Sequence, residues 1–449
     1  MRKDDATRAQ VMLTTVRPDR ILLGHPWVYR TEIRRVFGDP APGDVVDVVD
    51  ARGRPVGTGF INPASMITVR LLTHGRELYD EDLWRRRILE SVRLRQRLLP
   101  GRRSYRAVNA EGDGLPGLIV DRFEDVLVVE SLAYGTEVRL EAITQALCEG
   151  LGPQTIYLRT DAPVRRLEGL HPGDRTLYGP EPPEVVIIEE ENVRYGIDVR
   201  EGQKTGHFFD QRLNRLEAGR LCAGSDVLDA FCHTGGFGLQ ALRHGARSVY
   251  FLDASEAAVT RARGNAAMAG FLEHTEFEVA NAFDVLRRLE REERRFDAVI
   301  LDPPAFAKSK SALEGALRGY KEINLRALRL VRQGGLVVTS SCSQVVDRST
   351  FVSVLREAAF DNRQGVRVLG VRGAAPDHPW PLGESEGDYL KCVFLEADRA
   401  HVGQAAAKQA PEREAASRAV GESGSAFLPP LQASPRVSTA PLANSSRGV

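Results

Sequence analysis

Four short apolar segments, each leading into polar residues, constrain the fold of this chain more than any other feature. They span residues 227–231, 249–253, 296–302 and 335–342. Asp229, Asp253 and Asp302 stand in or at the end of the first three. Apolar runs of this length are typical of buried parallel strands. In an open α/β sheet the carboxyl ends of such strands build the site, so the sequence predicts a Rossmann-like sheet with its chemistry along one edge.

A glycine-rich turn follows the first of these segments. Thr234, Gly235 and Gly236 lie in it, and residues 239–242 read as the start of a helix. Glycine lets the backbone approach a ligand, and a helix N-terminus offers free N–H groups to an anion. The turn departs from the dinucleotide pattern and has no phosphate-loop lysine, so taken alone it is equally a tight strand-to-helix turn. Asp253, about 20 residues further on, favours a ribose-binding carboxylate.

Three motifs together carry a specific resemblance. Asp229-x-Phe231 with Thr234-Gly235-Gly236-Phe237, Asp302-Pro303-Pro304-x-Phe306, and Ser341-Cys342-Ser343 resemble the motifs of class I S-adenosylmethionine methyltransferases. The most similar group is the large-subunit (23S) ribosomal RNA cytosine-C5 methyltransferases that have an N-terminal PUA domain. The resemblance extends from about residue 10 to about residue 397.

This resemblance implies S-adenosylmethionine as cofactor and a set of residues that would bind it. Asp229 would face the methionine end and Asp253 the ribose diol. The backbone of Thr234–Gly236 would form the floor of the site. Asn281 stands where the family more often has Asp near the adenine amino group. The expected cofactor-binding residues are Phe209, Asp229, Phe231, Thr234, Gly235, Gly236, Asp253, Asn281, Ala282 and Asp302. Either Phe208 or Phe209 would contact the adenosyl group, with a hydrophobic staple and cap for a helix beginning near Asp210 as the alternative.

Cys342 and Asp302 are the expected catalytic residues. The C5 atom of cytosine is a poor nucleophile, and addition of a thiolate to C6 makes it enamine-like. Cys342 would therefore have to be partly accessible, with a depressed pKa, although a buried core cysteine is the alternative. Asp302 would hold the N3/N4 edge of the base. Pro304 occupies the place where many RNA cytosine-C5 enzymes have a second cysteine, so the base that removes the C5 proton stays open.

A group of basic and aromatic residues follows Asp302 and is expected to contact substrate RNA. Its members are Lys308, Arg318, Tyr320 and Lys321. Such a mixture suits a loop that clamps the backbone and stacks on an extruded base. A solvated helix face is the alternative.

The rest of the chain divides into further regions. Residues 8–75 alternate with period two between glycine and proline turns, which predicts a small RNA-binding β-barrel similar to PUA domains. Residues 76–185 are expected to form a small α/β linking domain, and residues 186–397 the methyltransferase domain. Residues 398–449 are rich in Ala, Ser and Pro and predict a disordered tail.

Charge, cysteine usage and hydropathy limit the remaining possibilities. The net charge is zero, but residues 81–107 hold nine arginines and three acidic residues, which suits either a phosphate-docking stripe or a solvated helix face. Five scattered cysteines without a C-x-x-C pair indicate neither a disulfide framework nor a metal site. No long apolar run predicts a membrane span, and the N-terminus lacks a signal peptide, so we expect a cytoplasmic protein. The expected partner is large-subunit ribosomal RNA, with a homodimer as a possibility.

Two rival functions stay open at this point. An Asp-Pro-Pro-aromatic element can also clamp an exocyclic amino group, which would make the chain an adenine or guanine amino methyltransferase. Here Ala305 displaces Phe306 by one residue, and Cys342 would have no role in that chemistry. The second rival is an RNA-binding assembly factor without catalytic activity.

Overall fold

The N-terminal part of the chain forms a six-stranded sheet. The computed structural model describes residues 8–75, 77–307 and 309–398. The strands are β1 (Gln10–Leu13), β2 (Trp27–Tyr29), β3 (Ile33–Phe37), β4 (Val45–Val49), β5 (Pro55–Ile61) and β6 (Ile67–His74). They are ordered β2-β6-β5-β4-β1-β3, with the short helices α1 (Asp19–Leu22) and η1 (Arg30–Glu32) between strands. The inward side chains of this sheet form a small separate core that includes Val11, Ile61 and Leu71.

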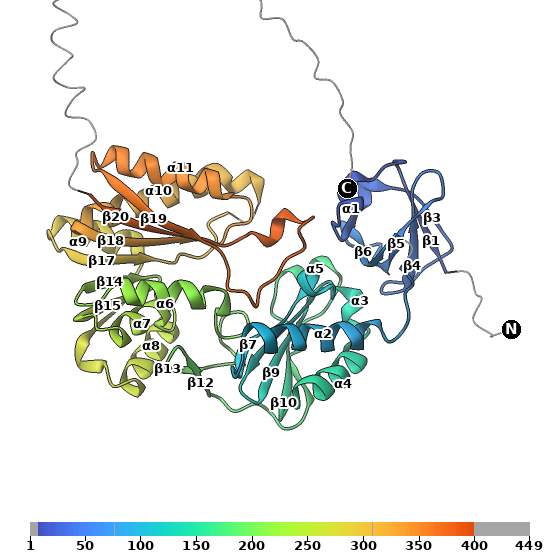
Figure 1. The fold of residues 1–449 in the computed structure, drawn as a ribbon, viewed down its shortest axis with the longest axis horizontal. Helices are drawn as coiled ribbons and strands as arrows, with labels where there is room; N and C mark the ends of the chain where they lie inside the picture. The colour runs from blue at the N-terminus through green and yellow to red at the C-terminus, as the bar shows by residue number, and fades with distance from the viewer. Residues whose placement is uncertain (1–7, 76, 308, 399–449) are drawn as a thin grey trace, which may run out of the picture. The chain divides into compact units, whose positions relative to one another are not determined.

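A second sheet and two packed helices form the next part (Figure 1). Its strands are β7 (Ser104–Asn109), β8 (Leu118–Phe123), β9 (Val126–Ser131), β10 (Thr155–Arg159) and β11 (Arg175–Tyr178), in the order β11-β10-β9-β8-β7. The helices α2 (Leu83–Leu98) and α4 (Leu140–Leu151) pack on each other and share a core with the sheet. Short helices complete this part: η2 (Ala110–Asp113), α3 (Tyr134–Glu137) and α5 (Val164–Leu167).

A hairpin and two helical segments lead into the last sheet. These are β12 (Val186–Glu190), β13 (Val193–Ile197), η3 (Phe209–Gln211) and α6 (Arg212–Leu221). The seven strands that follow are β14 (Asp226–Ala230), β15 (Ser248–Asp253), β16 (Thr275–Val279), β17 (Phe296–Leu301), β18 (Val331–Ser341), β19 (Val366–Arg372) and β20 (Lys391–Ala397). Their order is β16-β15-β14-β17-β18-β20-β19, and only β20 runs antiparallel to its neighbours.

Helices cover both faces of this seven-stranded sheet (Figure 1). One face packs against α6, α7 (Gly236–Arg243) and α8 (Glu256–Met268), together with the β12–β13 hairpin. The other packs against α9 (Ala282–Arg291), α10 (Leu313–Leu330) and α11 (Arg348–Asp361). Three single-turn helices, η4 (Leu272–His274), η5 (Lys310–Ala312) and η6 (Ser385–Gly387), lie in the connections. Because both faces are buried, the central strands are mainly apolar, as the sequence indicates.

The prediction of a Rossmann-like sheet preceded by a β domain and a small α/β part is confirmed. Across the described stretches 8–75, 77–307 and 309–398, no helix is both long and apolar enough to cross a bilayer. In the same stretches no three potential ligand side chains gather as a metal site would require. The tail predicted to be disordered, 398–449, lies outside the described residues from position 399 onward.

Candidate functional site

The turn between β14 and α7 has an unusual backbone. Phe231 and His233 have φ angles of 63° and 48°, and Gly235 has 88°. Left-handed conformations at non-glycine residues are strained and gather at ligand-binding positions. At Gly236, the first residue of α7, a Cβ would lie 2.8 Å from Cδ of the buried Arg215, so a larger residue would force that side chain to shift. The turn therefore keeps its backbone bare at the carboxyl edge of the sheet, where a cofactor could approach it.

Asp229 has the electrostatics expected of a ligand-binding carboxylate. It is buried, its Oδ2 accepts a hydrogen bond of 2.8 Å from the Gly238 N–H, and its Oδ1 has no partner among the described residues. Desolvation, with the nearby charges of Asp302 and Asp253, raises the pKa of this carboxyl to about 8. An unpartnered buried oxygen is costly, and a cationic ligand would satisfy it. This site therefore fits the ammonium of S-adenosylmethionine.

Asp253 and Asn281 follow the next two strands. Asp253 accepts backbone N–H bonds of 2.9 Å from both His233 and Ser255, one at each oxygen. A carboxylate keeps further lone pairs, so the ribose diol could still bind there. Asn281 caps α9, because its Oδ1 accepts from the Phe283 N–H at 2.9 Å. Ala282 is the buried first residue of that helix, where backbone N–H groups lack intrahelical partners.

The expectation that Phe209 contacts the adenosyl group is wrong. Phe209 is 1% exposed, and its ring packs 5.2 Å from the Phe123 ring and 5.1 Å from the His207 ring, in the core. The neighbouring residue Phe208 is half-buried, and its ring lies 5.1 Å from the His233 ring in the β14–α7 turn. Neighbouring side chains in this segment point in different directions, so Phe208, and not Phe209, lies beside the β14–α7 turn.

Asp302 lies just after β17 and is held by a network of hydrogen bonds. Its Oδ1 accepts a hydrogen bond of 2.8 Å from Nε2 of Gln211, which also donates to Oγ of Ser340 at 3.1 Å. Asn214 fixes the amide of Gln211 by donating to its Oε1 at 2.7 Å. Desolvation and the charge of Asp210 raise the pKa of Asp302 to about 6. The carboxyl is thus oriented and able to exchange a proton near neutral pH.

Cys342 follows β18 and is partly exposed, as expected. Its Sγ lies 3.9 Å from the carbonyl oxygen of Pro303, which places the thiol beside the residue that follows Asp302. The buried residues Ser341 and Ser343 flank it, and both hydroxyls contact the hydroxyl of Tyr320, at 3.1 and 2.9 Å. The expected depressed pKa is not observed. Burial, with the negative charge of Asp302, raises the pKa of the thiol to about 11.

One of the expected RNA-contacting residues is corrected by the structure, and a second forms ion pairs within the protein. Tyr320 is 0% exposed, on the inner face of α10, where its ring packs 4.6 Å from the ring of Phe306. It therefore supports the serines beside Cys342 and stacks on no exposed base. Lys321 forms ion pairs with Asp361 at 3.0 Å and Glu357 at 3.4 Å, which tie α10 to α11.

The other two RNA candidates have different outcomes. Arg318 has an exposed side chain on α10 and, among the described residues, pairs only with Glu314 one turn earlier in the helix. It stays available to a ligand, because an exposed pair of this kind is weak. Lys308 lies outside the described residues.

The arginine-rich segment 81–107 is mostly paired within the protein, which favours a structural role over a phosphate-docking stripe. Arg85 binds Glu149 on α4, Arg86 lies 2.7 Å from Asp80, and Arg106 lies 2.6 Å from the buried Asp121. The fully buried Arg95 forms an ion pair with Asp113. Arginines that neutralise acids in the fold leave little free charge for phosphates.

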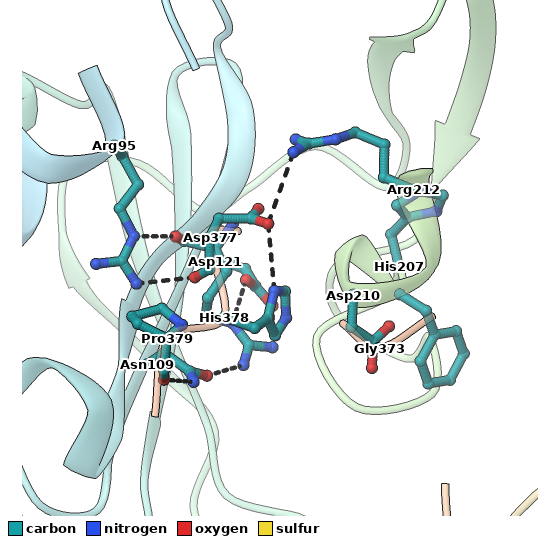
Figure 2. Close-up of polar contacts among 12 residues, drawn as sticks. Arg95, Asn109, Asp121, His207, Asp210, Arg212, Gly373, Asp377, His378 and Pro379 are labelled. Atoms are coloured by element: carbon teal, nitrogen blue, oxygen red, sulfur yellow. Dashed lines mark hydrogen bonds and ion pairs between the residues drawn. The ribbon is translucent and has the colours of Figure 1, made fainter. Parts of the chain in front are cut away.

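A buried polar cluster connects the loop after β19 to the second sheet and to α6. The carbonyl oxygen of Asp377 accepts from Arg95 at 2.8 Å, and its carboxylate accepts from the Arg106 N–H at 3.1 Å and lies 3.7 Å from the Arg212 guanidinium. Figure 2 shows Arg95, Arg212 and His378 arranged around Asp377. Burial by itself raises the pKa of Asp377, but the contacts with His378, Arg212 and the Arg106 N–H outweigh it and hold this pKa well below its usual value. The cluster fixes the start of α6, from which Gln211 and Arg212 project.

Several residues that build this site were missed by the sequence reasoning. Asn214 and Ser340 orient Gln211, and Lys391 is a fully buried lysine whose Nζ donates to the Ser343 carbonyl at 2.8 Å. A charged residue beginning the otherwise apolar run 392–395 was the available signal for Lys391. The partners of Gln211 left no such signal, because they lie far from it in sequence or carry no distinctive motif.

Comparison with known proteins places this geometry in a family. Residues 11–74 match a PUA-like domain, and residues 172–361 match an S-adenosylmethionine-dependent methyltransferase domain. The matched domain therefore uses S-adenosylmethionine, the cofactor that this site fits. A structure described as a SAM-dependent methyltransferase from Streptococcus mutans matches with a TM-score of 0.75 and 19% identity, covering 86% of this chain and 99% of that one. At that identity the likeness supports the fold alone.

Two relatives match the chain over most of its length. The "Ribosomal RNA large subunit methyltransferase I" of Aeromonas hydrophila is 39% identical over 87% of this chain and 99% of its own. The protein of the same name from Shewanella denitrificans is 41% identical over 82% of this chain and 94% of its own. This identity and coverage show that the chain belongs to the ribosomal RNA large subunit methyltransferase I family.

Proposed function

We propose that this protein methylates carbon 5 of a cytosine in large-subunit ribosomal RNA, through a covalent adduct between Cys342 and C6 of the base. The observation that carries the proposal is the placement of a partly exposed thiol beside the Asp302–Pro303 element, with Sγ 3.9 Å from the Pro303 carbonyl oxygen. Relatives at about 39% identity bear the name of a large-subunit ribosomal RNA methyltransferase, which supports the substrate class.

The chemistry requires a nucleophile at this position. Carbon 5 of an aromatic pyrimidine carries too little electron density to attack a methyl group. Addition of the Cys342 thiolate to C6 breaks the C5–C6 double bond and makes C5 enamine-like, so C5 can take the methyl. Loss of the C5 proton then expels the thiolate and restores the aromatic ring. An amino-group methyltransferase needs no such sulfur.

Asp302 would hold the Watson–Crick edge of the base. With a pKa of about 6, its carboxyl can take up a proton near neutral pH and donate it toward N3 as negative charge develops there. Its Oδ1 is already fixed by Gln211, which leaves the other oxygen for the base. Holding the ring beside the thiol turns the addition into a reaction between prepositioned groups.

The cofactor would be held by the residues at the turn after β14. S-Adenosylmethionine, when bound, supplies an electrophilic methyl group on a sulfonium. Asp229 would bind its ammonium through the unpartnered Oδ1, and Asp253 its ribose hydroxyls. Phe208, whose half-buried ring lies beside the His233 ring in the turn, would contact the adenosyl group in place of Phe209. Alignment of donor and acceptor is the main task, because the leaving group departs neutral.

Recognition of RNA would be shared between the PUA-like part and α10. The PUA-like residues 11–74 suit structured RNA, and the exposed Arg318 can contact phosphate. Enzymes that modify a base commonly extrude it from its stack, and the cytosine would enter the site in that way.

The test is nucleoside analysis of the product. Large-subunit RNA from cells lacking the protein would be incubated with the purified protein and isotopically labelled S-adenosylmethionine, then digested and resolved by mass spectrometry. We expect label in 5-methylcytidine and none when Cys342→Ala replaces the wild type. Label in N6-methyladenosine or N2-methylguanosine would overturn the proposal in favour of an amino methyltransferase, and absence of label with no donor binding would favour a binding factor.

A further inference from the structure

Arg215, on α6, is a buried guanidinium that lies outside the set of residues proposed to bind cofactor or RNA. It is 4% exposed and pairs with Glu190 of β12, which is 2% exposed. Its Nε and one terminal nitrogen donate to the two carboxylate oxygens of Glu190, at 2.8 and 2.7 Å. A buried ion pair is weak evidence for stability, because the desolvation of both charges offsets their attraction. The pair therefore needs a reason beyond stability.

The other terminal nitrogen of Arg215 binds the segment that carries Phe208. It donates to the Phe208 carbonyl oxygen at 2.9 Å. Nε2 of His207 lies 3.0 Å from the Arg215 guanidinium and 3.1 Å from Oε2 of Glu190, so the residue before Phe208 belongs to the same cluster. The ring of Phe208 lies beside the His233 ring in the β14–α7 turn. The direction of that ring therefore depends on a backbone that Arg215 holds.

The same ion pair supports the start of α7, on the other side of the turn. Cδ of Arg215 lies 2.8 Å from the place that a Cβ of Gly236 would take, so the stem of Arg215 packs against the first residue of the helix. The Glu190 carbonyl oxygen accepts from Nε2 of Gln240 on α7 at 2.9 Å. The hydroxyl of Tyr195, on β13, donates to the Gly236 carbonyl at 3.4 Å. Arg215 and Glu190 thus connect the Phe208 segment to the helix that follows the glycine turn.

A second buried arginine shows the same chemistry away from this site. Arg165 is 2% exposed, pairs with Glu137 at 2.9 Å and donates to the Ser131 carbonyl oxygen. Neither Arg165 nor its partners belong to the proposed cofactor or RNA site. A comparison of the two pairs therefore separates stabilisation of the fold from positioning of the site.

We propose that Arg215 is a positioning residue for the cofactor. It holds the Phe208 backbone and the start of α7 in one arrangement, so that the Phe208 ring and the glycine turn are in place before the adenosyl group binds. Less ordering then accompanies binding, which raises the affinity. Glu190 fixes the plane of the guanidinium through its bidentate contact. The inference rests on the proposed contact between Phe208 and the adenosyl group.

The test is S-adenosylhomocysteine binding by calorimetry, with urea unfolding of the same variants. Arg215→Met keeps the stem but leaves a buried carboxylate without its partner, so both stability and affinity should fall. Adding Glu190→Gln removes that unpaired charge and should return the urea midpoint most of the way to its wild-type value. We expect the affinity of the double variant to stay at least ~10-fold below wild type, because the Phe208 carbonyl has lost its donor. Affinity that returns together with stability would overturn the proposal.

The matched control is Glu137→Gln combined with Arg165→Met. It removes an equally buried arginine that also binds a carboxylate and a backbone carbonyl. This double variant should bind S-adenosylhomocysteine as the wild type does. Equal losses of affinity in the two double variants would trace the effect to general destabilisation and would refute the positioning role.

Arg215→Lys covers the case in which the double variant does not fold. Its ammonium can still pair with Glu190, but a single nitrogen cannot also hold the Phe208 carbonyl as the planar guanidinium does. In hydrogen exchange of the unliganded protein, amides of residues 207–211 and 236–240 should exchange several-fold faster than in the wild type, while those of β17 keep their rates. Wild-type exchange in both segments would contradict the proposal.

Phe208→Leu distinguishes a failure of this inference from a failure of the proposed function. None of these measurements uses RNA, so the identity of the methylated base does not affect them. Wild-type affinity of Phe208→Leu for S-adenosylhomocysteine would refute the proposed contact with the adenosyl group. Reduced affinity of Phe208→Leu, with wild-type affinity of the Glu190 and Arg215 double variant, would refute the positioning role alone.

Discussion

The carboxyl edge of the seven-stranded sheet and the arginine-rich segment 81–107 use charge in opposite ways. At the sheet edge, Asp229 keeps an unpartnered buried oxygen, and burial raises the pKa of both Asp229 and Asp302. In the arginine-rich segment, Arg95 and Arg106 are matched by Asp113 and Asp121. Charge that supports a fold is paired inside it, and charge reserved for a ligand is left unsatisfied until the ligand arrives.

Among the substitutions in these two regions, Cys342→Ala should have the largest effect on turnover. Without the sulfur no adduct forms at C6, and turnover should fall by roughly four orders of magnitude or more, within the range that removal of a catalytic nucleophile produces. Cofactor affinity should stay the same, because the thiol is proposed to touch the base only. Single-turnover methyl transfer and calorimetry with S-adenosylhomocysteine measure the two. Cys148→Ala, on α4, is the matched control and should keep wild-type turnover.

Replacing Asp377 by Ala tests how much a charge that is paired within the fold contributes to stability. Asp377→Ala leaves the buried Arg212 guanidinium without its carboxylate, and we expect the free energy of unfolding to fall by about 3–5 kcal/mol. The folded protein holds the pKa of Asp377 below its unfolded value, so its contribution is present above about pH 4 and is lost as the pH falls further. Urea unfolding at pH 7 and at a pH well below 4 measures this.

The control for Asp377 is Asp284→Ala, an exposed carboxylate on α9. It should leave the urea midpoint at its wild-type value. Equal midpoints for the Asp377 variant and this control would show that the buried cluster contributes no net stability.

Asp302→Asn should lower methyl transfer by about 10²- to 10³-fold, a typical loss for a general acid or base. The amide keeps the contact with Gln211 but cannot pass a proton toward N3. Turnover of the wild type should rise as the pH falls toward 6, because more of the Asp302 carboxyl is then protonated. The variant should lose this dependence on pH. Asp297→Asn, at the other end of β17, is the control. A pH profile shared by wild type and Asp302→Asn would contradict the role.

Asp229 should release a proton when the cofactor product binds. Its raised pKa of about 8 means that the free carboxyl is mostly protonated at pH 7, and an ammonium ligand binds only its ionised form. S-Adenosylhomocysteine binding should therefore release roughly one proton at pH 7, and affinity should rise with pH until about 8. Calorimetry in two buffers of different ionisation enthalpy measures the release. Asp229→Asn should abolish it and weaken binding by about tenfold, or about 1.4 kcal/mol.

The smallest expected effect separates Arg318, whose pair with Glu314 is highly exposed, from Arg86, which is paired with Asp80. Arg318→Ala should weaken RNA binding a few-fold and reduce the dependence on salt concentration by about one unit of slope, because one phosphate contact is lost. Arg86→Ala removes an arginine already bound to Asp80 and should leave both unchanged. Filter-binding measurements of RNA affinity over a series of salt concentrations test both variants. Equal losses for the two variants would show that pairing in the fold does not remove an arginine from RNA recognition.

The sequence could predict what depends on local pattern. The apolar strands, the glycine turn and the acids after β14, β15 and β17 all follow from residues close together in the chain. It could not choose between Phe208 and Phe209, because adjacent aromatics differ only in which way the folded segment turns them. It placed Tyr320 at a surface, although tertiary packing turns that side of α10 inward.

Long-range pairing explains the remaining failures. The partners of Arg106 and Arg85, Asp121 and Glu149, lie 15 and 64 residues away in sequence, and nothing local identifies them. Lys391 reads as an ordinary strand-edge lysine until its register with β18 is known. The pKa of Cys342 depends in the same way on groups from three separate segments, so its direction could not be read from the motif.

The most direct test of the central claim uses RNA in which cytidine is replaced by 5-fluorocytidine. Fluorine at C5 cannot leave as a proton does, so an enzyme that adds sulfur at C6 and methyl at C5 stays attached to its substrate. We predict a protein–RNA complex that survives denaturing gel electrophoresis, requires S-adenosylmethionine, and maps by peptide mass spectrometry to Cys342. Turnover of the fluorinated RNA without any such complex, or a complex that forms equally well with Cys342→Ala, would contradict the account.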